Sequence, residues 1–116
     1  MQTVKGQKKY LPETYRAVAG VLREGKTEAV TSKDIVMLTG VASKRDVHEI
    51  IEQLIVQHGY VIGSSRAGNH RGYYLISNAT ELQESLTTYN NQIQSMMKRH
   101  KKLNQNYIAS KNLEME

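Results

Sequence analysis

Four side chains near the middle of the sequence are of types that bind phosphate groups and nucleic-acid bases: Ser43, Lys44, Arg45 and His48. A serine that caps a helix can also offer its hydroxyl to a phosphate, and the first N–H groups of a helix favour anions. Arg45 suits a bidentate contact with guanine in a DNA major groove. His48 lies one helical turn beyond Lys44 and could touch a base or a phosphate. These residues predict a nucleic-acid contact; the alternative is a solvated helix face of mixed charge.

Two acidic residues restrict where that contact is expected. Glu49 and Glu52 follow on the same predicted helix and would repel phosphates. A nucleic acid is therefore expected to approach the first turn of the helix rather than its whole length.

A second cationic group lies between two short β-rich segments, in the stretch SRAGNHR. Its candidate contact residues are Arg66, Asn69, His70 and Arg71, and Lys33 adds a further cation upstream. Arginines at a hairpin tip can hold the phosphate backbone or enter the minor groove, where the potential is negative. The alternative is an exposed polar turn, which would also use glycine and asparagine.

Catalytic chemistry has little basis in this sequence. There is no cysteine, so thiolate metal sites and a cysteine nucleophile are excluded. The four histidines, His48, His58, His70 and His100, do not have the spacing of a metal-binding motif, and no glycine-rich phosphate loop is present. The prediction is a protein that is not an enzyme and needs no cofactor or metal.

The helices and strands that must position these residues are predicted from the spacing of apolar residues and from the residues that typically begin or end such elements. Helices are predicted over residues 12–24, 32–39 and 43–58, with buried positions at Ile35, Val36 and Leu38 in the second. Residues 29–31 are a possible short strand, and strands are predicted over 60–64 and 72–76. This order predicts an α+β, mainly α fold, a winged helix-turn-helix with three helices and a β-hairpin wing, followed by a long C-terminal helix.

The long last helix carries an apolar stripe with alternating spacings of four and three. The stripe comprises Leu82, Leu86, Tyr89, Ile93, Met96, His100, Leu103 and Tyr107. Such heptad spacing is typical of a coiled coil, and a helix of about 30 residues spans about 45 Å, more than the preceding domain can cover. The stripe therefore predicts a homodimer, with a shorter helix folded back on its own domain as the alternative. The basic residues from Lys98 to Lys102 are interpreted as a solvated face, with a DNA contact as the alternative.

Composition and charge along the sequence divide the chain into four predicted parts. The predicted parts are a flexible basic arm at 1–10, the winged helix-turn-helix at 11–77, the long helix at 78–108 and a frayed tail at 109–116. The net charge of +5 favours polyanionic partners. The chain contains no apolar run of about 18 residues and no secretory signal, so a cytoplasmic, nucleoid-associated protein without membrane contact is expected.

The stretch TSKDIVMLTGVASKRDVHEIIEQL resembles the helix-turn-helix of small winged-helix proteins from bacteria and their phages. With HGYVIGS and RGYYLISNATELQESL it is similar to a type found in Gram-positive phages and prophages, and the resemblance covers about residues 28–100. It implies a small DNA-binding protein of a phage or mobile element. The second helix of the motif, with Ser43 to His48, would read the major groove, and Arg66 to Arg71 would form the tip of the wing.

Two classes of function remain open. The first is a dimeric, sequence-specific binder of double-stranded DNA that regulates transcription or binds a replication origin. The second is a winged-helix docking module without DNA affinity, which would bind a replication or regulatory protein. Glu49 and Glu52 on the proposed recognition helix keep the second hypothesis open.

Overall fold

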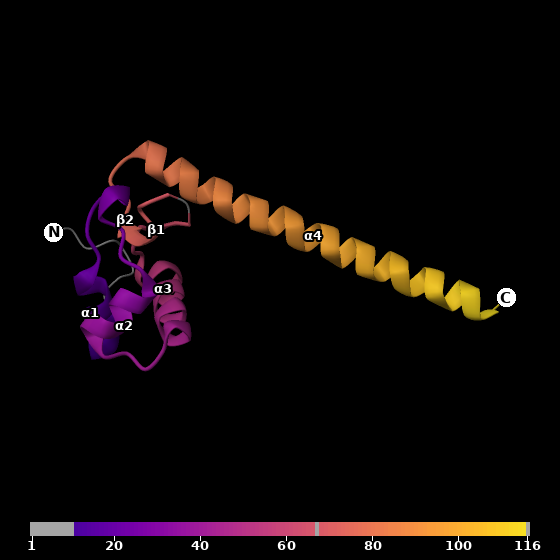
Figure 1. The fold of residues 1–116 in the computed structure, drawn as a ribbon, viewed down its shortest axis with the longest axis horizontal. Coiled ribbons are helices and arrows are strands. Elements are labelled where there is room, and N and C mark those ends of the chain that lie inside the picture. The colour runs from indigo at the N-terminus through magenta and orange to yellow at the C-terminus, as the bar shows by residue number, and fades with distance from the viewer. Residues whose placement is uncertain (1–10, 67, 116) are drawn as a thin grey trace. The chain divides into compact units, whose positions relative to one another are not determined.

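The computed structural model describes residues 11–66 and 68–115, so the predicted N-terminal arm lies outside the described residues (Figure 1). The elements are α1 (Glu13–Val21), a short 3₁₀ helix η1 (Lys26–Glu28), α2 (Ser32–Thr39), α3 (Lys44–His58), β1 (Ile62–Ser65), β2 (Gly72–Leu75) and α4 (Ala79–Met115). The predicted α+β, mainly α class with a hairpin and a long C-terminal helix is confirmed. The described residues divide into two compact units, one up to Leu82 and one from Gln83 onward.

Helix α1 is shorter than predicted. It was expected over residues 12–24 but runs only from Glu13 to Val21, with Pro12 as its N-cap. The residues after it pair with β2 instead: the N–H of Leu75 donates to the carbonyl of Arg23 (2.8 Å), and the N–H of Gly25 donates to the carbonyl of Leu75 (2.9 Å). This extended pairing requires the helix to end before Arg23.

The predictions for α2 and α3 are confirmed, and a side-chain cap begins each helix. The hydroxyl of Thr31 accepts from the N–H of Asp34, and the hydroxyl of Ser43 accepts from the N–H of Asp46, each at 3.1 Å. Gly40 ends α2 with a φ of 77°, a left-handed conformation that glycine adopts without a steric penalty.

The core of the first unit forms where α1, α2 and α3 pack together (Figure 1). Val18, Ile35, Val47 and Leu54 are fully buried in it. The prediction that Leu38 is buried is wrong, since this side chain is 66% exposed. The reason is that α2 packs through the side that carries Ile35 and Thr39, and Leu38 lies off that side.

The two strands form an antiparallel hairpin with Ile62 opposite Leu75 and Ser65 opposite Gly72. The strands begin and end within two residues of the predicted segments. The possible strand at residues 29–31 is reduced to one antiparallel bridge between Val30 and Tyr73. Strand β2 therefore has β1 on one side and Val30 on the other.

Helix α4 begins as the sequence predicts and ends later. The side chain of Asn78 accepts from the N–H of Glu81 at 2.9 Å, and the Glu81 carboxylate accepts from the N–H of Ser77 at 2.8 Å, which together cap the helix. The helix continues to Met115, beyond the predicted end at residue 108, so residues 109–115 of the predicted frayed tail are helical. None of the helices in the described part of the chain is both long and apolar enough to span a bilayer.

Candidate nucleic-acid interface

The first turn of α3 holds three of the predicted contact residues in a defined geometry. Val47, with no exposed surface, fixes this turn against the core, while Lys44 and Arg45 remain exposed beside it. Ser43 is half-buried, and its hydroxyl already accepts the N–H of Asp46. Its role is therefore first to cap the helix, and its O–H group remains available to donate to a further acceptor.

The angular positions on α3 separate Arg45 from the core. At about 100° per residue, Arg45 lies almost opposite the buried stripe that contains Val47 and Leu54. Glu49 lies one turn further along on the same side as Arg45 and is also exposed. The exposed face of α3 is thus basic at its start and acidic beyond, as the sequence suggested.

The hairpin carries the second cationic group at its tip. Strand pairing stops at Ser65 and Gly72, so the tip consists of residues 66–71. Its four predicted contact residues, Arg66, Asn69, His70 and Arg71, are all exposed. Gly68 has a φ of 71°, a backbone conformation suited to glycine in the tip.

The end of strand β2 nearest the hairpin tip is fixed to the start of α2. Val30 and Tyr73 exchange two backbone hydrogen bonds of 2.8 Å. The backbones approach so closely that a Cβ on Gly72 would overlap the carbonyl group of Val30 and lie 2.7 Å from the nitrogen of Thr31. Since Thr31 caps α2, the hairpin and the helix that carries the exposed Lys33 are joined at this point.

Tyr73 also contacts α3. Its ring meets the imidazole of His48 edge-on, with 6.0 Å between ring centroids and 64° between the planes. His48 is exposed, so the ring that was predicted to face a ligand also connects α3 to β2. Through Tyr73 the start of α2, helix α3 and the hairpin meet, and the structure thereby assembles the predicted contact residues in one unit.

Sequence reasoning did not identify Tyr73, Gly72 or Val30 as residues that position the site. The available signal was the alternation in GYYL: Tyr73 and Leu75 share the face of the strand that packs against the hydrophobic core, whereas Tyr74, 1% exposed, lies on the opposite face. Which segment would pair with that strand could not be read from the pattern. His58 was likewise overlooked, and it is buried with its ring 5.9 Å from that of Tyr15.

The basic side chains of this surface are not held in ion pairs within the described part of the chain. None of the five basic residues named as candidate contacts forms an ion pair with another described residue; they are Lys33, Lys44, Arg45, Arg66 and Arg71. The described residues contain no group of three or more acidic or histidine side chains arranged to hold a metal ion. The exposed cations give this surface positive charge and hydrogen-bond donors, which are the groups that an anionic ligand requires.

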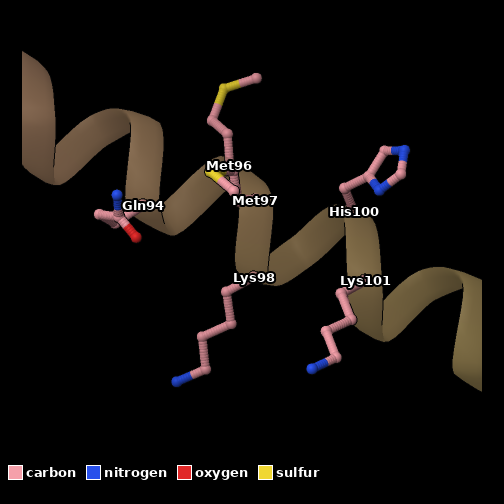
Figure 2. Close-up of a pocket in the computed structure, with 6 residues that line it drawn as sticks. All are labelled: Gln94, Met96, Met97, Lys98, His100 and Lys101. Carbon is pink, nitrogen blue, oxygen red and sulfur yellow. The ribbon is translucent and has the colours of Figure 1, made fainter.

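The stripe predicted for dimerisation lies along α4. Its members are exposed in the single chain, from 37% at Leu82 and 48% at Leu86 to 71% at Leu103. A hollow lined by Gln94, Met96, Met97, Lys98, His100 and Lys101 belongs entirely to this helix and is open surface rather than an enclosed cavity. Figure 2 shows Met96 and His100 on one side of the helix and Lys98 and Lys101 on the other. Apolar and basic residues are thus segregated around α4.

Comparison with protein-family models, with curated proteins and with solved structures finds no match to this chain.

Proposed function

We propose that the chain is a winged helix-turn-helix protein that binds double-stranded DNA in a sequence-specific manner. Helices α2 and α3 form the helix-turn-helix, α3 is the recognition helix for the major groove, and the hairpin is the wing that contacts the backbone or the minor groove. The resemblance in the sequence favours a transcriptional regulator of a phage or mobile element, with binding at a replication origin as the related alternative.

The observation that carries this proposal is the junction at Tyr73. It joins the basic first turn of α3 to the hairpin with the cationic tip, through the His48 ring contact and the backbone pairing with Val30. A duplex presents phosphates on both sides of each groove, so a protein that inserts a helix also needs cations beside that helix. Lys44 and Arg45 on α3 and Arg66 and Arg71 on the hairpin meet this requirement.

The experiment begins with selection of bound fragments from a random DNA pool, followed by fluorescence anisotropy with the selected duplex. Lys44→Ala and Arg45→Ala should weaken specific binding, by about 1–3 kcal/mol for a residue that reads a base. Arg16→Ala is the matched control, because Arg16 is an exposed cation on α1, outside the proposed surface.

The wing is tested with Arg71→Ala on selected and random duplexes. Affinity should fall by a similar factor on both, and the slope of log K against log salt should become shallower by about 0.9 if one phosphate contact is lost. If none of the three interface variants differs from the Arg16→Ala control, the proposal is wrong.

A second candidate function is docking to another protein, and the exposed apolar residues on α2 favour it. Met37 is 73% exposed and Leu38 66%, and both line a groove between α1 and α2. Glu49 and Glu52 on α3 also suit a partner other than DNA. Absent or salt-insensitive binding to random duplex would favour this docking function over DNA binding.

A further inference from the structure

An exposed apolar stripe, which we call the seam, runs along α4. We define the seam as the eight residues Leu82, Leu86, Tyr89, Ile93, Met96, His100, Leu103 and Tyr107. From Leu86 to Tyr107 every apolar member is between 48% and 71% exposed. An apolar stripe of this length on a polar helix is typical of a surface that pairs with another helix.

We infer that the seam is covered by the seam of a second copy of this chain, and that the two helices run antiparallel. The length and area suit such a partner. Residues 82–107 span about 39 Å of helix axis. If each seam side chain loses roughly 90 Å² of accessible surface, two copies bury on the order of 1,400 Å², within the range of stable interfaces.

The seam matches itself in the antiparallel orientation. With its centre between residues 94 and 95, the layers pair Leu82 with Tyr107, Leu86 with Leu103, Tyr89 with His100 and Ile93 with Met96, each occurring twice. Each tyrosine then packs against a smaller or polar side chain, and each imidazole lies beside a phenol that can hydrogen-bond to it. A parallel pair would instead place His100 against His100 and tyrosine against tyrosine in two layers.

The choice of seam residues also disfavours the parallel arrangement. Parallel two-stranded coiled coils favour β-branched residues at position a and leucine at position d. In this seam the a positions are Leu86, Ile93, His100 and Tyr107, of which only Ile93 is β-branched. The pattern therefore lacks the residue preference that specifies a parallel dimer.

The distribution of basic residues along α4 also favours the antiparallel pair, independently of the seam residues. Lys98, Arg99, Lys101 and Lys102 form a cluster of four cations within two turns of α4. A parallel pair would hold two such clusters side by side, about one helix diameter or 10 Å apart, where salt screens them only partly.

In the antiparallel pair each basic cluster lies beside the partner's residues 87–91, which carry no charge. The two clusters are then separated by about 16 Å along the axis. Glu81 and Glu84, near the start of the helix, then lie beside residues 105–108 of the second copy, which carry no charge, so this pairing brings no like charges together there. Lys98 and Lys101 project away from the side of Met96 and His100, so neither of these two lysines lies in the seam (Figure 2).

The first test is the association state of the full chain, measured by sedimentation at micromolar concentration. The wild type should be a dimer, and Ile93→Glu should be a monomer, because it places a carboxylate at the centre of the seam. Asn91→Glu is the matched control: it introduces the same residue two positions away, outside the seam, and should remain a dimer. A monomeric wild type, or a dimer that persists in Ile93→Glu, would overturn the inference.

The second test measures orientation without altering the seam. The chain has no cysteine, so Asn91→Cys and Gln105→Cys each allow a single spin label at equivalent outward positions of the heptad. In the antiparallel pair the two labels are offset along the axis by about 10 Å at position 91 and by about 32 Å at position 105.

Pulsed electron paramagnetic resonance should therefore give a clearly longer distance at position 105 than at 91. Equal distances at both positions would show a parallel pair and would overturn the antiparallel assignment. Neither test uses DNA, so its result is independent of whether the first unit binds DNA.

Discussion

At the scale of single residues, the proposed recognition helix carries side chains that attract phosphates and others that repel them. Lys44 and Arg45 occupy the first turn, while Glu49 and Glu52 are exposed further along the same helix. Acidic side chains near a groove reduce non-specific affinity because they repel every phosphate alike, whatever the base sequence. Under the proposed function, the two glutamates would restrict DNA to the start of α3.

We predict that Glu49→Gln combined with Glu52→Gln strengthens binding to random duplex. The change removes two negative charges from a surface with net positive charge, and it should lower the ratio of specific to non-specific affinity. Anisotropy titrations at two salt concentrations measure both quantities. Glu24→Gln, an exposed carboxylate outside α3, is the control; equal gains in both proteins would show that only net charge matters.

At the scale of elements, the orientation of the hairpin depends on the contact between Gly72 and residues 30–31. Gly72 has a φ of 122°, and a Cβ there would overlap the backbone of Val30. A side chain would force apart the segments that join the hairpin to α2, which carries Lys33.

We predict that Gly72→Ala lowers the free energy of unfolding by at least about 2 kcal/mol, from steric overlap together with backbone strain. Gly20→Ala is the matched control, since it lies in α1 with nothing within 4 Å of the added Cβ. That control should stabilise the protein by about 0.5–1 kcal/mol through helix propensity. Urea unfolding measures both, and a tolerated Gly72→Ala would contradict the close approach described here.

The first turn of α4 is held by Glu81. Its carboxylate accepts hydrogen bonds from the backbone N–H groups of Lys26 (2.9 Å) and Ser77 (2.8 Å). These bonds lower the pKa of Glu81 below its ordinary value of 4.5. The bond from Lys26 connects residues 55 positions apart in sequence and so ties the start of α4 to the segment that follows α1.

Because the folded state holds Glu81 ionised to a lower pH than the unfolded chain does, its stabilising contribution is complete above about pH 4.5. The contribution disappears as the pH falls through the lowered pKa. We predict that Glu81→Gln reduces stability at pH 7 and that the difference from wild type diminishes towards pH 3, as measured by urea unfolding midpoints. Glu24→Gln should show no such convergence; an unchanged difference at both pH values would contradict the assigned role of the Glu81 carboxylate.

At the scale of the whole molecule, the proposals for the two units together predict the symmetry of the DNA site. Two copies paired through identical seams are related by a two-fold axis. The selected DNA should therefore contain an inverted repeat with half-sites separated by whole helical turns. The Ile93→Glu variant should bind a single half-site with an affinity close to that of the wild type but lose the added affinity for the repeat. Selection of a single, asymmetric site would contradict a symmetric complex.

The sequence alone determined the features that depend on local chemistry. Thr31 with Asp34, Ser43 with Asp46 and the glycine at position 40 specify where α2 and α3 begin and where α2 ends, because caps and left-handed turns act within a few residues. The alternation of residues along the strands and the heptad spacing of α4 are likewise periodic patterns that can be recognised in the sequence. The candidate contact residues on α3 and in the hairpin followed from residue type alone.

Only the tertiary structure decided which segments meet. The early end of α1, the exposure of Leu38 and the pairing of Val30 with Tyr73 depend on contacts between residues distant in sequence, and no local pattern encodes those partners. The same holds for Gly72, which reads as an ordinary turn glycine until the backbone of Val30 is placed against it. Local free energies specify the helices and strands, whereas burial of apolar surface and pairing of backbone groups determine how those elements assemble the site.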